Sequence, residues 1–428
     1  MDGRPRSPAI LSGSGRLKPR TPVCRVVSSL ERYVSVPRRV IADLQGGGRG
    51  KALSAVAFGW FLSISTRMIY PALLPSIRST YGLTLTTAGL LLTVLWVAYG
   101  VGQLPGGMLA DWAGERTLLV ASSLLAAAML ALVVLADSPP VLFAGTALFG
   151  LGTATYGVSR FTVLKDIYPD RLGTATGVTM AAGDVGNAVM PPAAGVLAGA
   201  IAWQYGFGVV IPLFVVAAGA LWLTVPTDAS ETVPIREAFS VDDLAPLFRR
   251  PVVRHSMVLL MLWATVVQAF IGFYPTYLID AKGFSSTTAT VLFGFFFALG
   301  SLIKPVAGRA YDRVGVRYPL AVMMGITALT LAALPFATGL PSFVGLTVLA
   351  SAILGYETVV ISNLTDRLPD GSRGSKLGAL RTVYIMVGAV SPVAFGAVAD
   401  RGYFDEGFLG IAAVSAVVVA FALVYVDY

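Results

Sequence analysis

The chain has 428 residues, of which 56% are hydrophobic and only 13% are charged, and its mean hydropathy is +0.76. Soluble domains carry about a quarter charged residues, so this composition excludes a protein whose main solvent is water. One cysteine and one histidine exclude a disulfide framework and the usual zinc sites. The sequence has no P-loop, Gly-rich dinucleotide turn or nucleophile elbow. We therefore expect neither an enzyme nor an ATP-driven pump, and no cofactor or metal.

The apolar runs, taken in chain order, predict twelve transmembrane helices. Each run is close to the ~20 residues that a helix needs to cross the hydrocarbon of a bilayer. The expected helices span residues 52–77, 84–109, 117–136, 140–164, 173–199, 205–226, 256–279, 286–308, 318–338, 341–364, 376–399 and 406–427. Short polar turns separate these runs, which predicts an all-α integral membrane protein.

Two polar segments interrupt this pattern. Residues 1–51 hold 11 Lys and Arg residues against three acids, which predicts a basic, disordered cytoplasmic tail attracted to anionic lipid. An organellar transit peptide and an upstream start-site artefact are the alternatives for this tail. Residues 227–255 form a linker in which Val241, Leu244 and Phe248 share a helical face. This face predicts an amphipathic helix on the membrane surface, with a solvated linker as the alternative.

The placement of positive charge predicts the orientation. Apart from the tail, 13 Lys and Arg residues lie in loops on the side of the N-terminus, against three on the other side: Arg78, Lys282 and Arg401. Both termini are therefore expected in the cytoplasm of a cell with this protein in its plasma membrane. The net charge of +8 is explained by the positive residues that set the orientation in the membrane. It does not indicate a nucleic-acid-binding surface, so we expect no nucleic-acid partner.

The second half of the chain repeats the first. Residues 107–116 (GMLADWAGER) recur as residues 308–317 (GRAYDRVGVR), and every matched position is shifted by 201. A parallel repeat of this kind predicts two pseudo-symmetric six-helix bundles, at 52–226 and 256–428, with a path between them at mid-membrane.

This duplicated Gly-x-Leu-Ala-Asp-x-x-Gly-x-Arg loop resembles the signature of the major facilitator superfamily. The resemblance covers residues 52–427 and implies a twelve-helix secondary transporter that works by alternating access, with helices 1, 4, 7 and 10 lining the path. We expect a monomer whose partners are a solute, a coupling proton and the bilayer. The resemblance implies gating roles for the charged loop residues, which are Asp111, Arg116, Asp312, Arg313 and Arg317.

The subfamily motifs favour anions over drugs. The helix-4 and helix-5 signatures of proton-coupled drug antiporters are broken in this chain: residues 146–152 lack the Arg and Gln, and Asn187 follows Gly186. The run Lys304-Pro305-Val-Ala-Gly308 is similar to the basic-Pro-x-x-Gly pattern of monocarboxylate porters. Those porters carry an acidic residue earlier in helix 8, and this chain has none there.

Away from the helix ends, six ionisable residues lie within the predicted helices, where each costs a few kcal/mol in hydrocarbon: Arg67, Arg160, Asp184, Lys304, Glu357 and Arg381. Four are cations and two are acids, an excess that favours an anionic substrate. Pairs of Arg67 with Asp184 and of Glu357 with Arg381 would leave Arg160 and Lys304 uncompensated. Snorkelling to the membrane edge is the alternative for Arg160, Lys304 and Arg381.

These residues define a candidate site. We expect substrate contacts from the guanidiniums of Arg67, Arg160 and Arg381, because an arginine grips a carboxylate through two hydrogen bonds. Their aromatic neighbours in the expected cavity are Tyr156, Tyr274 and Tyr384.

Either Asp184 or Glu357 is expected to carry the coupling proton, because desolvation favours a neutral carboxyl. Asp184 is preferred, because no cation lies one turn away on its own helix. The alternatives to anion transport are export of hydrophobic or cationic compounds and a non-transporting receptor or scaffold.

Overall fold

A computed structural model describes residues 49–227, 248–367 and 373–425, without the side chains at 104–108, 110–112 and 373–377. The description below concerns the compact unit Lys51–Tyr428. Nearly all of the predicted basic tail and most of the predicted amphipathic segment, including Val241 and Leu244, lie outside the described residues.

Within the described ranges, the chain forms twelve helical crossings, as expected. The N-terminal bundle consists of α2 (Arg49–Tyr81), α3 (Leu85–Ala113), α4 (Glu115–Val134), α5 (Pro139–Ile167), α6 (Leu172–Ala200) and α7 (Trp203–Gly208), which α8 (Val210–Thr224) continues. The C-terminal bundle consists of α11 (Pro251–Asp280), α12 (Ser286–Val314), α13 (Arg317–Ala333) with η3 (Leu334–Phe336), α14 (Gly339–Ala350) with α15 (Ile353–Arg367), α16 (Arg373–Ala389) with α17 (Ser391–Ala399), and α18 (Phe404–Tyr425).

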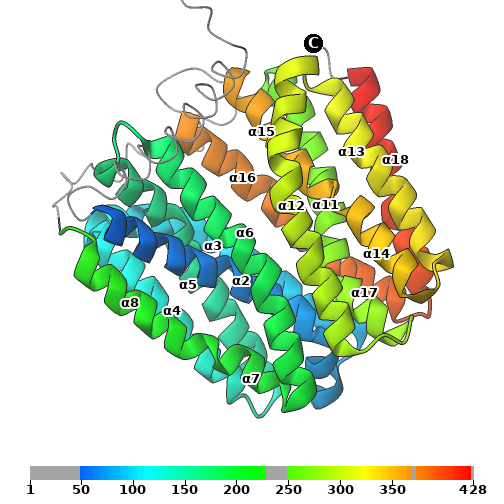
Figure 1. The fold of residues 1–428 in the computed structure, drawn as a ribbon, viewed down its shortest axis with the longest axis horizontal. Helices are drawn as coiled ribbons and strands as arrows, with labels where there is room; N and C mark the ends of the chain where they lie inside the picture. Colours follow the sequence, from blue (N-terminus) through cyan, green and yellow to red (C-terminus); the bar gives the residue numbers. More distant parts are fainter. Residues whose placement is uncertain (1–48, 228–247, 368–372, 426–428) are drawn as a thin grey trace, which may run out of the picture. The chain divides into compact units, whose positions relative to one another are not determined.

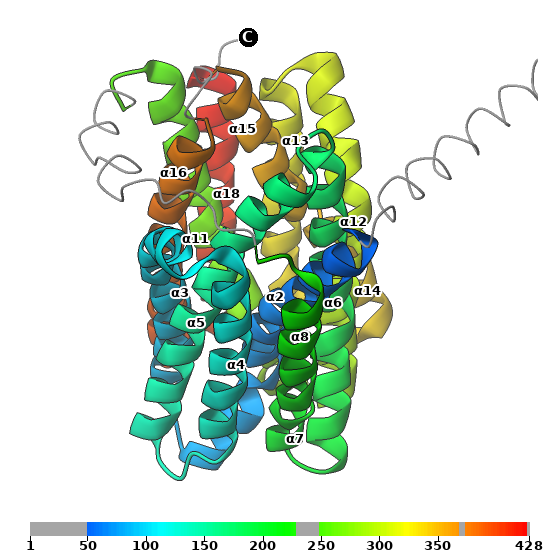
Figure 2. The ribbon, with the colours of Figure 1, turned by 90° about the vertical axis from the view of Figure 1, so that its left-hand side faces the viewer.

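The two bundles lie side by side. Figure 1 shows α2 to α8 in blue to green on the left and α11 to α18 in lime to red on the right. Seen from the side, the helices run roughly parallel from one end to the other (Figure 2). The crossing made of α16 and α17 is split where Pro392 stands in the first turn of α17, because proline cannot continue the backbone ladder of α16.

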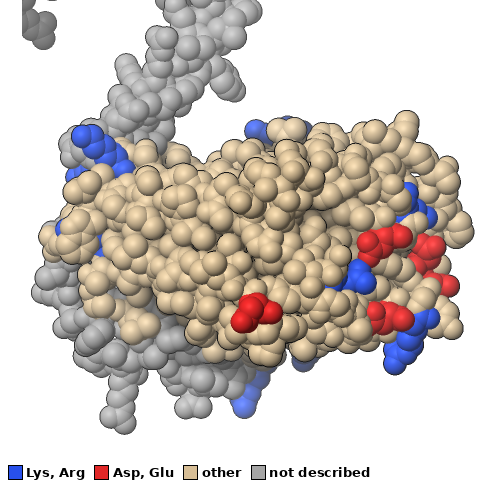
Figure 3. All heavy atoms as spheres, turned by 90° about the horizontal axis from the view of Figure 1, so that it is seen from below, with Lys and Arg blue, Asp and Glu red and all other residues tan. Residues whose placement is uncertain are grey.

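The surface of this unit suits a lipid environment. Eleven helices among the described residues are long and apolar enough to cross a membrane. The twelfth, α6, has 29 residues, but Asp184, Asn187 and its many Gly and Ala residues lower its hydropathy. Figure 3 shows a broad face with few charged side chains: an acidic one lies in its lower middle, and most of the others gather at its right-hand side.

The bundles meet closely along α3 and α17 and along α6 and α12. A Cβ atom added to Gly89 of α3 would lie 2.3 Å from the Pro392 carbonyl oxygen, and one added to Gly396 of α17 would lie 2.3 Å from that of Leu85. A Cβ on Gly294 of α12 would lie 2.4 Å from the Ala188 carbonyl oxygen of α6. Glycine at these positions lets two backbones touch, as in other membrane helix pairs.

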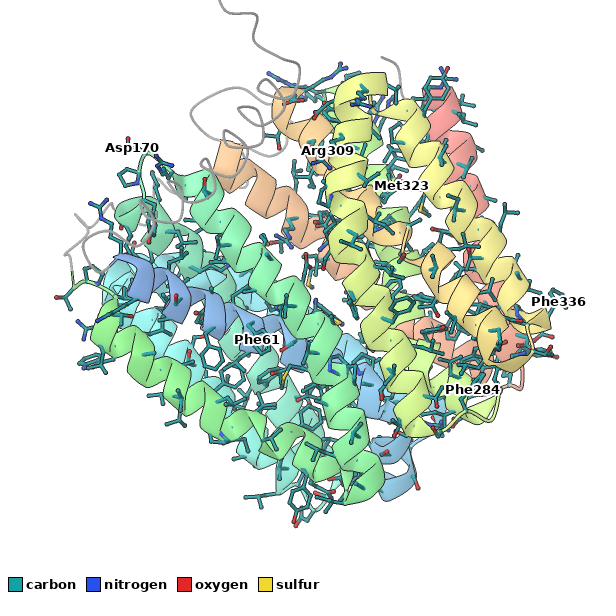
Figure 4. All side chains as sticks on the ribbon, in the orientation of Figure 1. Phe61, Asp170, Phe284, Arg309, Met323 and Phe336 are labelled. Atoms are coloured by element: carbon teal, nitrogen blue, oxygen red, sulfur yellow. The ribbon has the colours of Figure 1, made fainter. Side chains whose placement is uncertain are left out.

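Polar contacts join the bundles at one end, which we call the far face. It is the end formed by the loops after α2, α4, α6, α11, η3 and α17, opposite the start of α2 and the end of α18. In Figure 4, Phe284 and Phe336 lie at this end of the C-terminal bundle, and Arg309 lies towards the other. The Asp400 carboxylate accepts hydrogen bonds from the backbone N–H groups of Leu85 (2.6 Å) and Thr86 (2.7 Å) and from the Thr86 hydroxyl.

This contact is an N-cap supplied from the other bundle. Asp400 follows α17, and the groups it binds begin α3, where unpaired N–H groups and the helix dipole favour an anion. An ion pair between Arg78 at the end of α2 and Asp280 at the end of α11, at 2.5 Å, joins the bundles at the same face. Asp400 and this ion pair therefore hold the two bundles together at the far face of the described structure.

Protonation of Asp400 should loosen the far face. Desolvation by burial opposes ionisation, but hydrogen bonds from Thr86 and Leu85 outweigh it and leave the pKa of Asp400 below its usual range. The contribution of Asp400 to closure is therefore present at neutral pH and lost as the pH falls through this lowered pKa, below the ~3.9 of a free aspartate.

We expect Asp400→Asn to open the far face at neutral pH, where the wild-type residue is ionised. The measurement is maleimide labelling of Thr93→Cys, on the buried side of α3, in a Cys24→Ser background. Labelling should rise several-fold over the same background with Asp400 intact. Asp137→Asn, at an exposed far-face position without a cross-bundle contact among the described residues, is the matched control. Equal labelling in both variants would contradict the role of Asp400.

Candidate functional site

Arg67 lies in the interior of the N-terminal bundle. Its side chain, on α2, is 1% exposed, and its Nε donates to the Ser63 carbonyl oxygen one turn earlier, at 3.2 Å. Its guanidinium carbon lies 3.8 Å from the ring centre of Tyr99, 5.5 Å from that of Trp96 and 5.7 Å from that of Trp60. Rings on α2 and α3 therefore surround this cation and stabilise it through cation–π contacts.

Arg160 on α5 has the same kind of environment. It is also 1% exposed, and its guanidinium carbon lies 3.3 Å from the ring centre of Trp60 and 4.3 Å from that of Phe161. Its Nε donates to the Gly157 carbonyl oxygen at 3.3 Å, and its Nη2 lies 3.8 Å from the sulfur of Met180. Its Nη1 is buried without a hydrogen-bond partner. Trp60 is thus shared by two arginines.

We call this group the two-arginine cage: Arg67, Arg160, Trp60, Trp96, Tyr99 and Phe161. Glycines on three helices give its rings their space. A Cβ on Gly157 of α5 would lie 3.0 Å from the Tyr99 hydroxyl, and one on Gly183 of α6 would lie 2.5 Å from Trp60 Nε1. A Cβ on Gly59 of α2 would lie 2.1 Å from the hydroxyl of Tyr156, which packs beside the cage. Any larger residue in place of these glycines would push the rings out of position.

The predicted pair of Arg67 with Asp184 is wrong. Asp184 of α6 instead forms an ion pair with Lys304 of α12 at 2.6 Å, across the seam between the bundles. Lys304 is therefore compensated, contrary to the prediction that it remains free. Arg160, for its part, is buried in the cage and does not snorkel. Among the described residues, no carboxylate lies within ion-pairing distance of Arg67 or Arg160.

The predicted pair of Arg381 with Glu357 is confirmed. Arg381 Nη2 lies 4.0 Å from Glu357 Oε1, and the Tyr384 hydroxyl donates to the same oxygen at 2.5 Å. These residues come from α15 and α16 of the C-terminal bundle. Tyr99 lies on α3 and Arg381 lies on α16, and these helices pack closely: a Cβ added to Gly100 of α3 would lie 2.6 Å from the sulfur of Met386 on α16. The cage and this cluster thus lie on neighbouring helices of the two bundles.

The other predicted aromatic contacts are already engaged within their own bundles. The Tyr156 hydroxyl donates to the Val56 carbonyl oxygen of α2 at 2.9 Å. The Tyr274 hydroxyl of α11 shares a hydrogen bond with the Thr347 hydroxyl of α14 at 2.6 Å. Both side chains are fully buried, so in this state they position helices and do not offer free donors.

The predicted gating residues lie at the end of the unit opposite the far face. The Asp111 side chain lies outside the described residues, and Asp312 and Arg313 are exposed. Arg317 donates to the Leu423 carbonyl oxygen, and the Arg116 guanidinium lies 4.2 Å from the ring centre of Trp222. Among described side chains, none of these residues forms an ion pair across the bundles, and their gating role stays a prediction.

Sequence reasoning missed Trp96 and Tyr99. Both lie on α3, which is not one of the helices that the family resemblance assigns to the path, and neither is charged. Their spacing of three residues on one helical face, opposite the aromatic face of α2, is the signal that could have found them. Among the described residues, no cluster of His, Cys, Asp or Glu could hold a metal ion.

Comparisons with known proteins agree on a transporter fold. The family model described as Major Facilitator Superfamily matches residues 56–363 and 283–428. A bacterial homolog of the human lysosomal transporter Spinster, solved in an inward-facing and unoccupied conformation, superposes with a TM-score of 0.77 at 16% identity, over 89% of this chain and 97% of that one.

Three curated relatives are named for their solutes. A 2-nitroimidazole transporter of Escherichia coli is 26% identical over 82% of this chain and 89% of its own length. A probable sulfoacetate transporter of Cupriavidus necator is 24% identical over 84% of this chain and 90% of its own length. A probable nitrate transporter of Staphylococcus epidermidis is 25% identical over 57% of this chain, and the match spans 62% of its length.

Loss of the shared ring should destabilise the cage. We expect Trp60→Leu to lower the thermal midpoint of the purified protein, because both guanidiniums lose a cation–π contact worth about 0.5–2 kcal/mol. Trp60→Phe keeps an aromatic face and should recover much of the loss. Trp222→Leu removes the half-exposed ring beside Arg116 and serves as the matched control. Equal midpoints for the Leu and Phe variants would show that the ring acts by volume alone.

Proposed function

This chain belongs to the major facilitator superfamily, and we propose that it is a secondary transporter that moves a small anion across the membrane by alternating access. Secondary transporters of this architecture bind their solute near mid-membrane, between two repeats that rock about it. The two-arginine cage of the N-terminal bundle and the Arg381 cluster of the C-terminal bundle are the site we assign to the solute.

The observation that carries this proposal is the pair of uncompensated guanidiniums, Arg67 and Arg160. A buried charge without a partner costs several kcal/mol, and cation–π contacts offset only part of that cost. An anion that enters the cage supplies the missing charge and accepts hydrogen bonds from free N–H groups, such as those of Arg160 Nη1. The same positive charge repels a cation, which argues against the alternative of cation export.

Relatives named for nitrate and sulfoacetate support an anionic solute. The relative named for 2-nitroimidazole shows that the family resemblance alone does not fix the charge of the solute. The argument for this chain therefore depends on its own arginines.

The proposed orientation places both termini in the cytoplasm of a plasma-membrane protein, because the loops on that side carry most of the Lys and Arg residues. The far face then lies outside the cell. The contacts that join the bundles there, those of Asp400 and of Arg78 with Asp280, support a state whose solute path leads to the cytoplasm. In the opposite state, we propose that the loops with Asp111 and Asp312 close the cytoplasmic end. The protein would act as a monomer.

We propose that Asp184 couples transport to a proton. The reason is not the absence of a nearby cation, as expected from the sequence, but the position of its cationic partner. Its partner Lys304 lies on the other bundle, so the ion pair spans the seam between α6 and α12. Protonation of Asp184 weakens this pair and with it a contact between the bundles. Glu357 pairs with Arg381 inside one bundle, so its protonation would not directly change how the bundles meet.

Arg67→Gln should weaken anion binding. Glutamine can still donate hydrogen bonds but carries no charge, and a hydrogen bond to a charged group contributes about 1.5–3 kcal/mol, or roughly 10- to 150-fold in affinity. The measurement is anion uptake into proteoliposomes as a function of concentration. The control is Lys165→Gln, which removes an exposed cation from α5. Unchanged affinity in Arg67→Gln would remove Arg67 from the site.

Asp184→Asn should abolish uphill transport, because asparagine mimics the protonated carboxyl permanently. Exchange of solute across the membrane should survive. Proteoliposomes with an imposed pH gradient measure both activities, and Asp170→Asn, in an exposed loop, is the control. The double variant Asp184→Asn/Lys304→Gln separates the two roles of Asp184: if it regains pH-driven accumulation, Asp184 serves only as a partner for Lys304.

A further inference from the structure

We propose that the solute of this transporter carries two negative charges. The inference rests on the proposed function, since it assigns a charge to the anion that the cage binds. It follows from which cations in the interior are already neutralised and which are not.

The interior charges separate into paired and unpaired groups. Lys304 is neutralised by Asp184 across the bundle seam, and Arg381 by Glu357 within the C-terminal bundle. The four pairing residues are also partly exposed, with side-chain exposures between 19% and 38%. Arg67 and Arg160 are 1% exposed, and among the described residues neither has an acidic partner. The cage therefore holds two positive charges that its surroundings do not balance.

A solute with one negative charge would leave one of these guanidiniums uncompensated. Each sits in a low-dielectric interior, where an unbalanced charge costs several kcal/mol and a cation–π contact returns at most about 2 kcal/mol. A solute with two negative charges balances both. A third negative charge would have no partner, because Arg381 already has Glu357.

Both arginines lie beside one ring. The guanidinium carbon of Arg67 lies 5.7 Å from the ring centre of Trp60 and that of Arg160 lies 3.3 Å from it, so we expect one small solute to reach both. Arg67 has one recorded hydrogen bond through Nε, and Arg160 keeps Nη1 unpaired. Donors at the edges of two guanidiniums suit the oxygens of sulfonate, sulfate or carboxylate groups.

The test compares anions of one and two charges on the purified full-length protein. Thermal shift and proteoliposome counterflow are measured with sulfate and sulfoacetate, which carry two charges at pH 7, and with nitrate and methanesulfonate, which carry one. Ionic strength is held constant. We expect at least a tenfold tighter apparent affinity for the two-charge anions. If only sulfate binds tightly, the solute carries both charges on a single tetrahedral group. If only sulfoacetate binds tightly, the solute carries its two charges on separate groups.

Arg160→Gln provides the decisive variant, because it lowers the charge of the cage by one. We expect the affinity for two-charge anions to fall more than the affinity for one-charge anions, so that the preference for two-charge anions drops at least tenfold. Lys165→Gln, which removes a cation from the exposed side of the same helix, should keep the wild-type preference.

The outcomes separate this inference from the proposed function. Transport of one-charge anions with equal or higher affinity in the wild type would overturn the two-charge inference and leave anion transport intact. Absence of binding and counterflow for all four anions would count against both. A preference that survives unchanged in Arg160→Gln would also overturn the inference, because the second charge would then lie elsewhere.

Discussion

Two guanidiniums beside one indole ring, without a carboxylate near them among the described residues, are the feature on which the rest of this structure depends. Arg67 and Arg160 contribute positive charge to an interior that tolerates it poorly, and the aromatic contacts of Trp60 and Tyr99 offset only part of the cost. The N-terminal bundle is built around them. Its glycines, such as Gly157 and Gly183, leave space for the rings, so the backbone of three helices is adapted to two cations.

The remaining interior charges connect the site to the contacts between the bundles. The pair of Lys304 with Asp184 crosses the seam of α6 and α12, next to the close backbone contact at Gly294. The acid of this pair is therefore also a contact between the bundles. At the far face, Asp400 caps a helix of the opposite bundle in the same way that a residue normally caps its own helix. Charged side chains therefore join the two bundles in two places, at the seam of α6 and α12 and at the far face.

Much of this arrangement could be predicted from sequence. The twelve crossings are confirmed, because length and hydropathy are visible along the chain. The interior charges were recognisable because any ionisable residue in an apolar run is conspicuous. The possible pair of Arg67 with Asp184 was wrong, because Asp184 pairs with Lys304 of the other bundle. Trp96 and Tyr99 were missed, because an aromatic residue in a transmembrane helix is ordinary until a cation is found above its ring.

The sequence by itself determined the membrane class, the two-bundle fold and the excess of cations in the interior. These properties follow from composition, from hydropathy and from the repeat along the chain, and they do not depend on how the helices are rotated. Only the tertiary structure decided which cation has an acidic partner. Lys304 and Asp184 are 120 residues apart, and they meet because α6 and α12 pack with particular faces together. Rotation of either helix by one residue, about 100°, would separate them, so the unpaired state of Arg67 and Arg160 is a property of packing.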